Sequence, residues 1–110
     1  MTRVKLFFAD GHIVAVESKG HTGYAESGKD IVCAAVSAIV QTALLGLVQV
    51  AKAEVKKTTR EGYLKFAVVT NNDDERKAAD VILATMRLAV KDLQSGYPSH
   101  IKLEEIENVY

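Results

Sequence analysis

The feature that most constrains this chain is a long apolar stretch, residues 31–52, with few helix breakers. Apolar side chains recur in it at intervals of three and four residues, the spacing of a buried helix face. Much of the opposite face is apolar too, so we expect a helix covered by a sheet and by a second helix or a partner subunit. The predicted buried face consists of Val32, Ala35, Val36, Ile39, Val40, Ala43, Leu44, Leu47 and Val48.

The residues before this stretch predict a β-hairpin. Residues 3–9 alternate apolar and other side chains, and residues 12–18 form the returning strand. Asp10 and Gly11 suit the two-residue turn between them, because both central positions of such a turn need a positive φ.

The second half of the chain repeats this order in outline. Residues 53–59 and 63–70 predict a second hairpin around a turn that contains glycine, and residues 71–96 predict a helix with an acidic start. We expect that helix to end at Gly96, and we expect a last strand in residues 100–106. The predicted inner stripe of the helix is Ala78, Val81, Ile82, Thr85, Leu88 and Ala89.

The order of these elements predicts an α+β fold. Strands joined by tight turns favour antiparallel pairing, so two hairpins and a last strand should form a mainly antiparallel sheet packed with two helices. A chain of 110 residues is enough for one core, and we treat residues 1–110 as a single domain.

Composition restricts the possible partners. The 14 Lys and Arg residues balance 14 Asp and Glu residues, so the composition supplies no generally basic surface and we expect no direct nucleic-acid contact. A local basic run, from Lys52 to Arg60, is interpreted as a solvated helix end and strand edge. Polar residues interrupt the apolar stretch, and the first residues lack the pattern of a signal peptide. We therefore expect a cytoplasmic protein with no membrane span.

The single cysteine, Cys33, follows a loop rich in glycine. If the helix begins near Asp30, Cys33 lies in its first turn, where unpaired backbone N–H groups and the helix dipole favour a thiolate. His21 could stabilise that thiolate and later donate a proton to a leaving amine. The same N–H groups could hold the oxyanion of a tetrahedral intermediate. This placement therefore suits nucleophilic catalysis.

Glycines bracket the loop between His21 and Cys33. Gly20, Gly23 and Gly28 allow tight bends and the close approach of another chain, so the loop could act as a lid over a peptide. A strand-to-helix connection that needs only sharp turns explains the same glycines equally well.

Each candidate residue also has a structural interpretation. A lone cysteine among alanine and valine is often a small core residue, and a lone histidine is often solvated. Asp30 suits an N-cap as well as an orienting carboxylate, and Ser37 could bond a carbonyl of its own helix. No close-spaced pair of ligands supports a metal site, and no cofactor is indicated.

Residues 20–37, GHTGYAESGKDIVCAAVS, closely resemble the ribosomal-processing cysteine protease family, Prp. The family pattern has Gly-His at the start of a loop and Gly-x-Asp-Ile-Val-Cys-Ala-x-Val-Ser after it. The matching residues here are Gly20, His21, Gly28, Asp30, Ile31, Val32, Cys33, Ala34, Val36 and Ser37. Thr22 departs from the commoner small residue.

The resemblance implies an endopeptidase that removes an N-terminal extension from the large-subunit ribosomal protein L twenty-seven. By that resemblance Cys33 is the nucleophile, His21 the general base and acid, and Asp30 a supporting residue. It also implies a homodimer whose glycine-rich loop moves to admit the ribosomal protein precursor. Two other classes stay open at this stage: a non-catalytic ribosome-associated binding protein, and a thiol hydrolase or acyltransferase acting on a small molecule.

Overall fold

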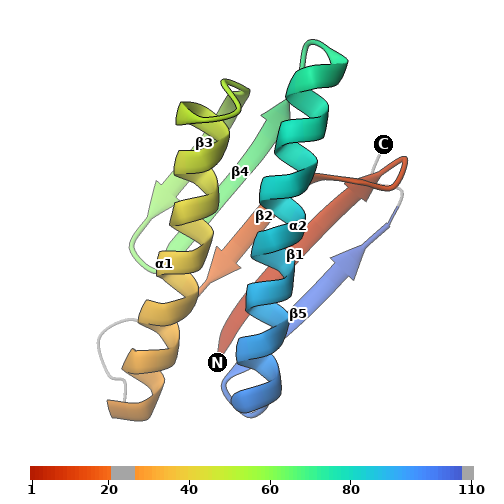
Figure 1. The fold of residues 1–110 in the computed structure, drawn as a ribbon. Helices are drawn as coiled ribbons and strands as arrows, with labels where there is room; N and C mark the ends of the chain where they lie inside the picture. Colours follow the sequence, from red (N-terminus) through yellow and green to blue (C-terminus); the bar gives the residue numbers. More distant parts are fainter. Residues whose placement is uncertain (21–26, 108–110) are drawn as a thin grey trace.

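The fold is a five-stranded sheet with two long helices on one face (Figure 1). It is seen in a computed structural model, which describes residues 1–20 and 27–107, with only the backbone described for residues 27–30. The elements in chain order are β1 (Thr2–Ala9), β2 (His12–Lys19), α1 (Ser27–Gln49), β3 (Glu54–Arg60), β4 (Tyr63–Val69), α2 (Asp73–Gly96) and β5 (Ile101–Ile106).

The sheet has the order β3-β4-β2-β1-β5. Three neighbouring pairs are antiparallel, and only β1 and β5 run parallel, so the prediction of a mainly antiparallel α+β sheet is confirmed. The connection through α1 starts at the end of β2, and the connection through α2 starts at the end of β4. These two strands are antiparallel, and the two connections run toward opposite edges of the sheet. The right-handed preference of such crossovers therefore puts both helices on the same face and leaves the other face open.

Both predicted hairpins are present. Asp10 and Gly11 have φ angles of 50° and 79°, as the two-residue turn requires. In the second hairpin Gly62 takes a φ of 69° between β3 and β4. Both turns thus bear out the local sequence signal.

The core lies between the helices and the sheet. Leu6, Val16 and Phe66 are fully buried on three adjacent strands, and they lie opposite one another in the strand register. From α1 come Val32, Val36, Val40, Ala43 and Leu47, all of which belong to the predicted buried face.

The inner stripe predicted for α2 is wrong by part of a turn. Val81 and Leu88 are 67% and 62% exposed. The buried residues are instead Ala79, Leu83, Met86 and Val90. The helix is apolar on two faces, and sequence spacing cannot tell which face meets the sheet.

One helix end matches expectation and one does not. Helix α2 ends at Gly96 as predicted, and the N–H of Tyr97 closes it by bonding the Leu93 carbonyl at 2.9 Å. The start of α1 is Ser27, three residues before the Asp30 start assumed from the sequence. Helix α2 begins at Asp73 with the predicted acidic first turn, and the Asn72 side chain before it accepts from the Glu75 N–H at 2.9 Å.

Helix α1 is also apolar enough to raise the question of a membrane. Residues Ile31–Gln49 have a mean hydropathy of 2.3, which by length and composition would allow a span, and only 28% of that window is buried. One face of α1 packs on the sheet, so part of this apolar content belongs to the core. The rest is outer surface.

Candidate functional site

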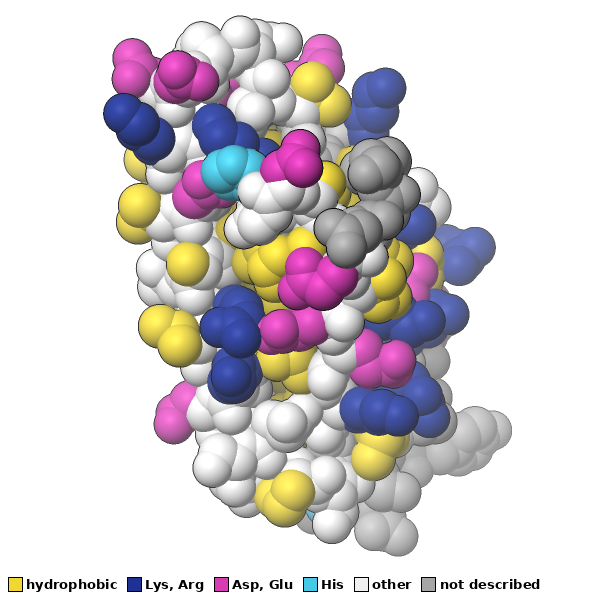
Figure 2. Space-filling model, turned by 90° about the vertical axis from the view of Figure 1, so that its right-hand side faces the viewer, with side chains coloured by type: hydrophobic (Ala, Val, Ile, Leu, Met, Phe, Trp, Pro, Cys, Tyr) yellow, Lys and Arg dark blue, Asp and Glu magenta, His cyan; other side chains and the backbone are white. Residues whose placement is uncertain are grey.

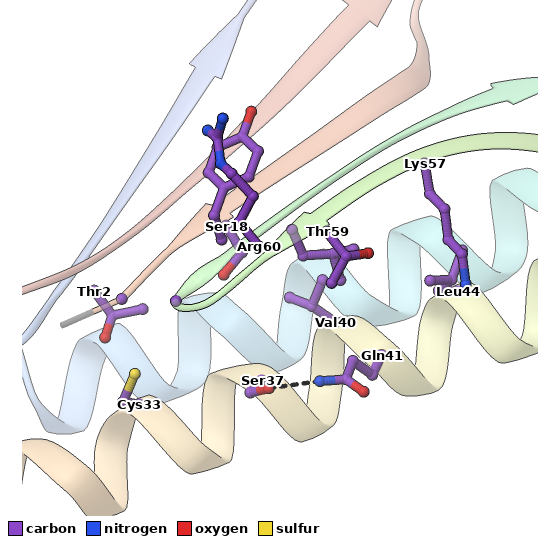
Figure 3. Close-up of a pocket in the computed structure, with 14 residues that line it drawn as sticks. Thr2, Ser18, Cys33, Ser37, Val40, Gln41, Leu44, Lys57, Thr59 and Arg60 are labelled. Atoms are coloured by element: carbon purple, nitrogen blue, oxygen red, sulfur yellow. Dashed lines mark hydrogen bonds between the residues drawn. The ribbon is translucent and has the colours of Figure 1, made fainter. Parts of the chain in front are cut away.

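Cys33 projects from α1 into a cavity of about 270 Å³ at one end of the sheet (Figure 3). The cavity lies between α1 and the ends of β1, β2, β3 and β4. Its lining residues are Thr2, Ser18, Gly20, Cys33, Ser37, Val40, Gln41, Leu44, Lys57, Thr59, Arg60, Gly62, Tyr63 and Leu64. Cys33 is partly exposed, so its sulfur is accessible from the cavity.

Gly20 brings the end of β2 against this sulfur. Its N–H donates to the Gly62 carbonyl at 2.9 Å, which fixes the end of β2 to the turn between β3 and β4. A β-carbon added to Gly20 would overlap the Cys33 Sγ. The missing side chain of Gly20 therefore makes room for the cysteine of the same chain.

The early start of α1 corrects the predicted electrostatics of Cys33. Cys33 is the seventh residue of the helix and lies in its second turn. Its N–H belongs to the helical ladder and is not one of the unpaired groups of a first turn. The helix dipole also weakens within one turn of the helix end. Neither the thiolate nor an oxyanion can therefore rely on α1 as we expected.

The same start changes the interpretation of Asp30 and Gly28. Asp30 is the fourth residue of α1, so it is not the N-cap. Gly28 lies inside the helix and is not part of the loop. His21 and Gly23 belong to residues 21–26, which lie outside the described residues. The side chain of Asp30 is not described either.

Ser37 lies one helical turn after Cys33 and lines the cavity. Its hydroxyl accepts a hydrogen bond from Gln41 Nε2 at 2.8 Å, a side chain of the same helix and not the backbone carbonyl we considered. Beyond this pair the cavity continues along α1, with Val40 and Leu44 on one side and Lys57 and Thr59 of β3 on the other. It therefore combines an apolar floor with a polar rim.

Thr2 is a cavity residue that sequence reasoning missed. It is the buried polar residue of the described core, and its N–H donates to the His100 carbonyl at 2.8 Å. Its hydroxyl points toward the Cys33 sulfur (Figure 3). A threonine in the first strand gives no sequence signal of this kind, because only the sheet order brings it beside α1.

Tyr63, the first residue of β4, is among the residues that line the cavity. Its hydroxyl donates to Glu17 Oε2 at 2.8 Å, and the Arg60 guanidinium lies 4.2 Å from its ring centre. The hydrogen bond to Glu17, partial burial and the Glu17 charge raise the pKa of Tyr63, and Arg60 opposes them. Tyr63 thus contacts groups on two neighbouring strands, of which Glu17 favours its protonated form.

His12 lies elsewhere. Its Nδ1 is 2.9 Å from Asp80 Oδ2, and Arg76 Nη2 is 2.8 Å from the other oxygen of that carboxylate. These groups join β2 to α2 beside a separate cavity that Arg87 and Glu105 also line. Within the described part of the chain no cluster of three possible metal ligands occurs.

A protein-family model described as "Cysteine protease Prp" matches residues 1–102. The ribosomal processing cysteine protease Prp of Staphylococcus aureus is 30% identical over 97 residues, which cover 86% of this chain and 88% of that protein.

Two solved structures have the same fold. A Streptococcus mutans protein superimposes with a TM-score of 0.87 at 24% identity, covering 97% of this chain and 95% of that one. The S. aureus ribosomal processing protease Prp, solved with a covalently linked product peptide, superimposes with a TM-score of 0.81 at 27% identity. That match covers 96% of this chain and 99% of the S. aureus chain.

Proposed function

This chain belongs to the cysteine protease Prp family and is a cysteine endopeptidase, and from that premise we propose that it processes a ribosomal protein precursor in the cytoplasm. The substrate we propose is the large-subunit protein L twenty-seven, whose N-terminal extension would be cut off during ribosome maturation. The observation that carries the proposal is Cys33, set against Gly20 in a cavity of about 270 Å³.

We assign Cys33 as the nucleophile and His21 as its general base and acid. The thiolate would attack the scissile carbonyl to form a thioester, and His21 would give its proton to the leaving amine. Water would then hydrolyse the thioester, with His21 taking the proton of the water and returning the thiol. One covalent fact supports this pairing. His21 is joined directly to Gly20, and consecutive α-carbons are about 3.8 Å apart.

Asp30 is proposed to support His21 by its charge. The alternative was that Asp30 is the N-cap of the helix. Because α1 begins at Ser27, Asp30 does not have that role. Ser37 is proposed to shape the cavity wall through its hydrogen bond with Gln41.

The oxyanion needs a donor other than the start of α1. We propose the Thr2 hydroxyl, which faces the Cys33 sulfur from β1. A donor placed where negative charge develops lowers the barrier most when it is held in position beforehand. The backbone bond from Thr2 to His100 and the burial of Thr2 provide that rigidity.

The lining of the cavity supports a substrate with a large apolar side chain. Val40, Leu44 and Leu64 provide a floor for a large apolar side chain, and each fully buried side chain of that kind contributes about 1.5–3 kcal/mol. Gln41, Lys57 and Thr59 line the rim, where they can bond the main chain of a peptide. We therefore propose cleavage after an aromatic residue of an extended segment. The glycine-rich loop would have to open before this segment could enter the cavity.

We also propose a homodimer formed through the outer surface of the helices. Ile39, Ala43 and Gly46 of α1 and Val81 and Ile82 of α2 line an apolar groove of about 370 Å³ between the helices. Leu45 and Leu88 are each 62% exposed on the same helices. An isologous contact would cover this surface with a copy of itself.

The test is incubation with the host's extended ribosomal protein, followed by intact mass measurement. The expected result is one cut that removes the extension, absent with Cys33→Ala, while casein stays intact. Equal digestion of both substrates would contradict a specific processing enzyme. If neither is cut although Cys33 reacts with alkylating reagents, the substrate assignment is wrong.

A further inference from the structure

A row of side chains crosses all five strands on the open face of the sheet, and four of its five members are cations. The strand register places Arg60, Tyr63, Lys19, Arg3 and Lys102 side by side, one from each strand in sheet order. We call these five residues the cationic row. Its four cations are exposed and span about 19 Å, since neighbouring strands lie about 4.8 Å apart.

The whole open face is basic although the chain has no net charge. The register puts seven cations and three carboxylates on this side of the described strands. The cations are Arg3, Lys5, Lys19, Lys56, Arg60, Lys65 and Lys102, and the carboxylates are Glu17, Glu54 and Glu104. Figure 2 shows Lys and Arg side chains along its right-hand edge, the side toward which the open face is turned.

The charges are not evenly spread over this face. The next row along the strands is Thr58, Lys65, Glu17, Lys5 and Glu104, in which the carboxylates alternate with the lysines. The cationic row has no carboxylate of its own. Arg3 reaches into the next row, where its Nη1 lies 3.9 Å from Glu104 Oε1.

Within the cationic row like charges face each other. Arg3 is the register partner of both Lys19 and Lys102, and directly opposed like charges destabilise a strand pair. Lys19 Nζ also lies 5.7 Å from the centre of the Tyr63 ring, whose other neighbour is Arg60. A row of phosphates laid along the cations would remove this repulsion and release counterions.

The cationic row borders the cavity of Cys33. Thr2, Gly20 and Gly62, which line the cavity, are the chain neighbours of Arg3, Lys19 and Tyr63. Alternate residues of a strand point to opposite faces, so the row and the cavity lie at the same end of the sheet, and Arg60 and Tyr63 of the row also line the cavity. A substrate protein held on a nucleic acid at the row would present its extension next to Cys33.

We propose that the cationic row binds the phosphate backbone of RNA. This inference rests on the proposed function, because a ribosomal protein precursor is the substrate most naturally met together with RNA. Tyr63 lies among the cations, and an aromatic ring on a sheet surface can stack an unpaired base. The proposed contact is therefore with single-stranded or looped RNA, without sequence specificity.

The test is fluorescence anisotropy with a labelled 20-nucleotide oligouridine, from 50 to 200 mM salt. Four phosphate contacts on a single strand predict a slope of log affinity against log salt of about −2.8, or about 50-fold weaker binding over this range. Lys19→Gln with Lys102→Gln should reduce the slope to about −1.4, or about 7-fold. The matched control is Lys77→Gln with Lys91→Gln on α2, which removes the same charge elsewhere and should bind as the unmodified protein does.

Peptide cleavage separates this proposal from the proposed function. Lys19 and Lys102 do not line the cavity, so their variant should cut a short peptide at the unmodified rate. Cys33→Ala should bind RNA normally and cut nothing. Equal loss of RNA binding in both lysine pairs would overturn the cationic row as the site. Binding to vesicles containing phosphatidylglycerol, without binding to oligouridine, would overturn RNA in favour of a membrane surface.

Discussion

The Cys33 sulfur lies against the α-carbon of Gly20, so closely that a β-carbon at residue 20 would overlap it. This contact joins the end of β2 to α1, and the residue that follows Gly20 in the sequence is the proposed base, His21. A glycine is needed here for space and not for a left-handed φ, which Gly20 does not adopt.

Gly20→Ala should therefore impair catalysis more than folding. The new methyl group can be accommodated if Cys33 rotates about χ1, so we expect at least a tenfold loss of peptide cleavage. The loss of stability should lie near the lower end of the 1–3 kcal/mol typical of overpacking. Cleavage assays and urea unfolding would measure both effects.

Two controls accompany this variant. Gly96→Ala places a methyl group where nothing lies within 4 Å, and it should leave cleavage unchanged. Gly20→Ala combined with Cys33→Ala should recover the lost stability, because the overlapping sulfur is gone. If the single variant cuts peptide normally, the Gly20 contact does not position the site.

Alkylation of Cys33 tests the proposed pair with His21. Cys33 lies in the second turn of α1, so the helix start does not explain a reactive thiolate. The reactivity of Cys33 should therefore depend more strongly on His21 than that of a cysteine in a first turn would. We expect iodoacetamide to react with Cys33 near neutral pH faster than with a model thiol, and His21→Ala to remove that advantage. Rates measured against pH would decide the matter. An unchanged profile in His21→Ala would exclude the ion pair.

Thr2 can be tested by changing only its hydroxyl. Thr2→Val keeps the shape and removes the donor, so the turnover number should fall about 100- to 1000-fold if the hydroxyl binds the oxyanion. Thr2→Ser keeps a donor and should retain most activity. The Michaelis constant should change little in both, since the interaction forms in the transition state. Equal activity of the valine and serine variants would rule out this role.

The sequence predicted the hairpins and the order of the elements because these depend on local signals. The turn at Asp10–Gly11 needs two residues with positive φ, and the alternation of Val4 and Leu6 specifies one buried strand face. The motif around Cys33 identified the family for the same reason, since it is contiguous. In contrast, the face of α2 that meets the sheet depends on tertiary packing, and Val81 was assigned to the wrong side.

Relationships between distant segments had no sequence signal. Arg3, Lys19, Arg60 and Lys102 are spread over nearly the whole chain, and only the strand register places them in one row. A balanced composition concealed this local excess of positive charge. The sequence instead drew attention to a contiguous basic run, in which Lys57 points into the cavity and not toward the open face. The Thr2 hydroxyl was missed for the same reason.

The homodimer can be tested on the outer surface of the helices. Val81→Glu places a charge at an exposed position beside the apolar groove, so it should shift a dimer to monomer without unfolding the chain. Val50→Glu is the control, because Val50 is 76% exposed, follows the last residue of α1 and does not line the groove. Sedimentation at micromolar concentration would show the change. Unmodified protein that sediments as a monomer would contradict the dimer.

Ionisation of Tyr63 should weaken the folded state at high pH. The raised pKa means that the folded protein retains this proton after the unfolded chain has lost it. The contribution is therefore complete below about pH 10, the ordinary pKa of tyrosine, and is lost as the pH rises through the folded value. The bond that depends on the proton is the 2.8 Å contact from the Tyr63 hydroxyl to Glu17.

Urea midpoints measured from pH 8 to pH 11 should fall more steeply for the unmodified protein than for Tyr63→Phe, which has no hydroxyl to titrate. Tyr97→Phe removes a more exposed tyrosine and should follow the unmodified curve. Parallel curves for all three proteins would show that the hydrogen bond to Glu17 does not couple Tyr63 to folding.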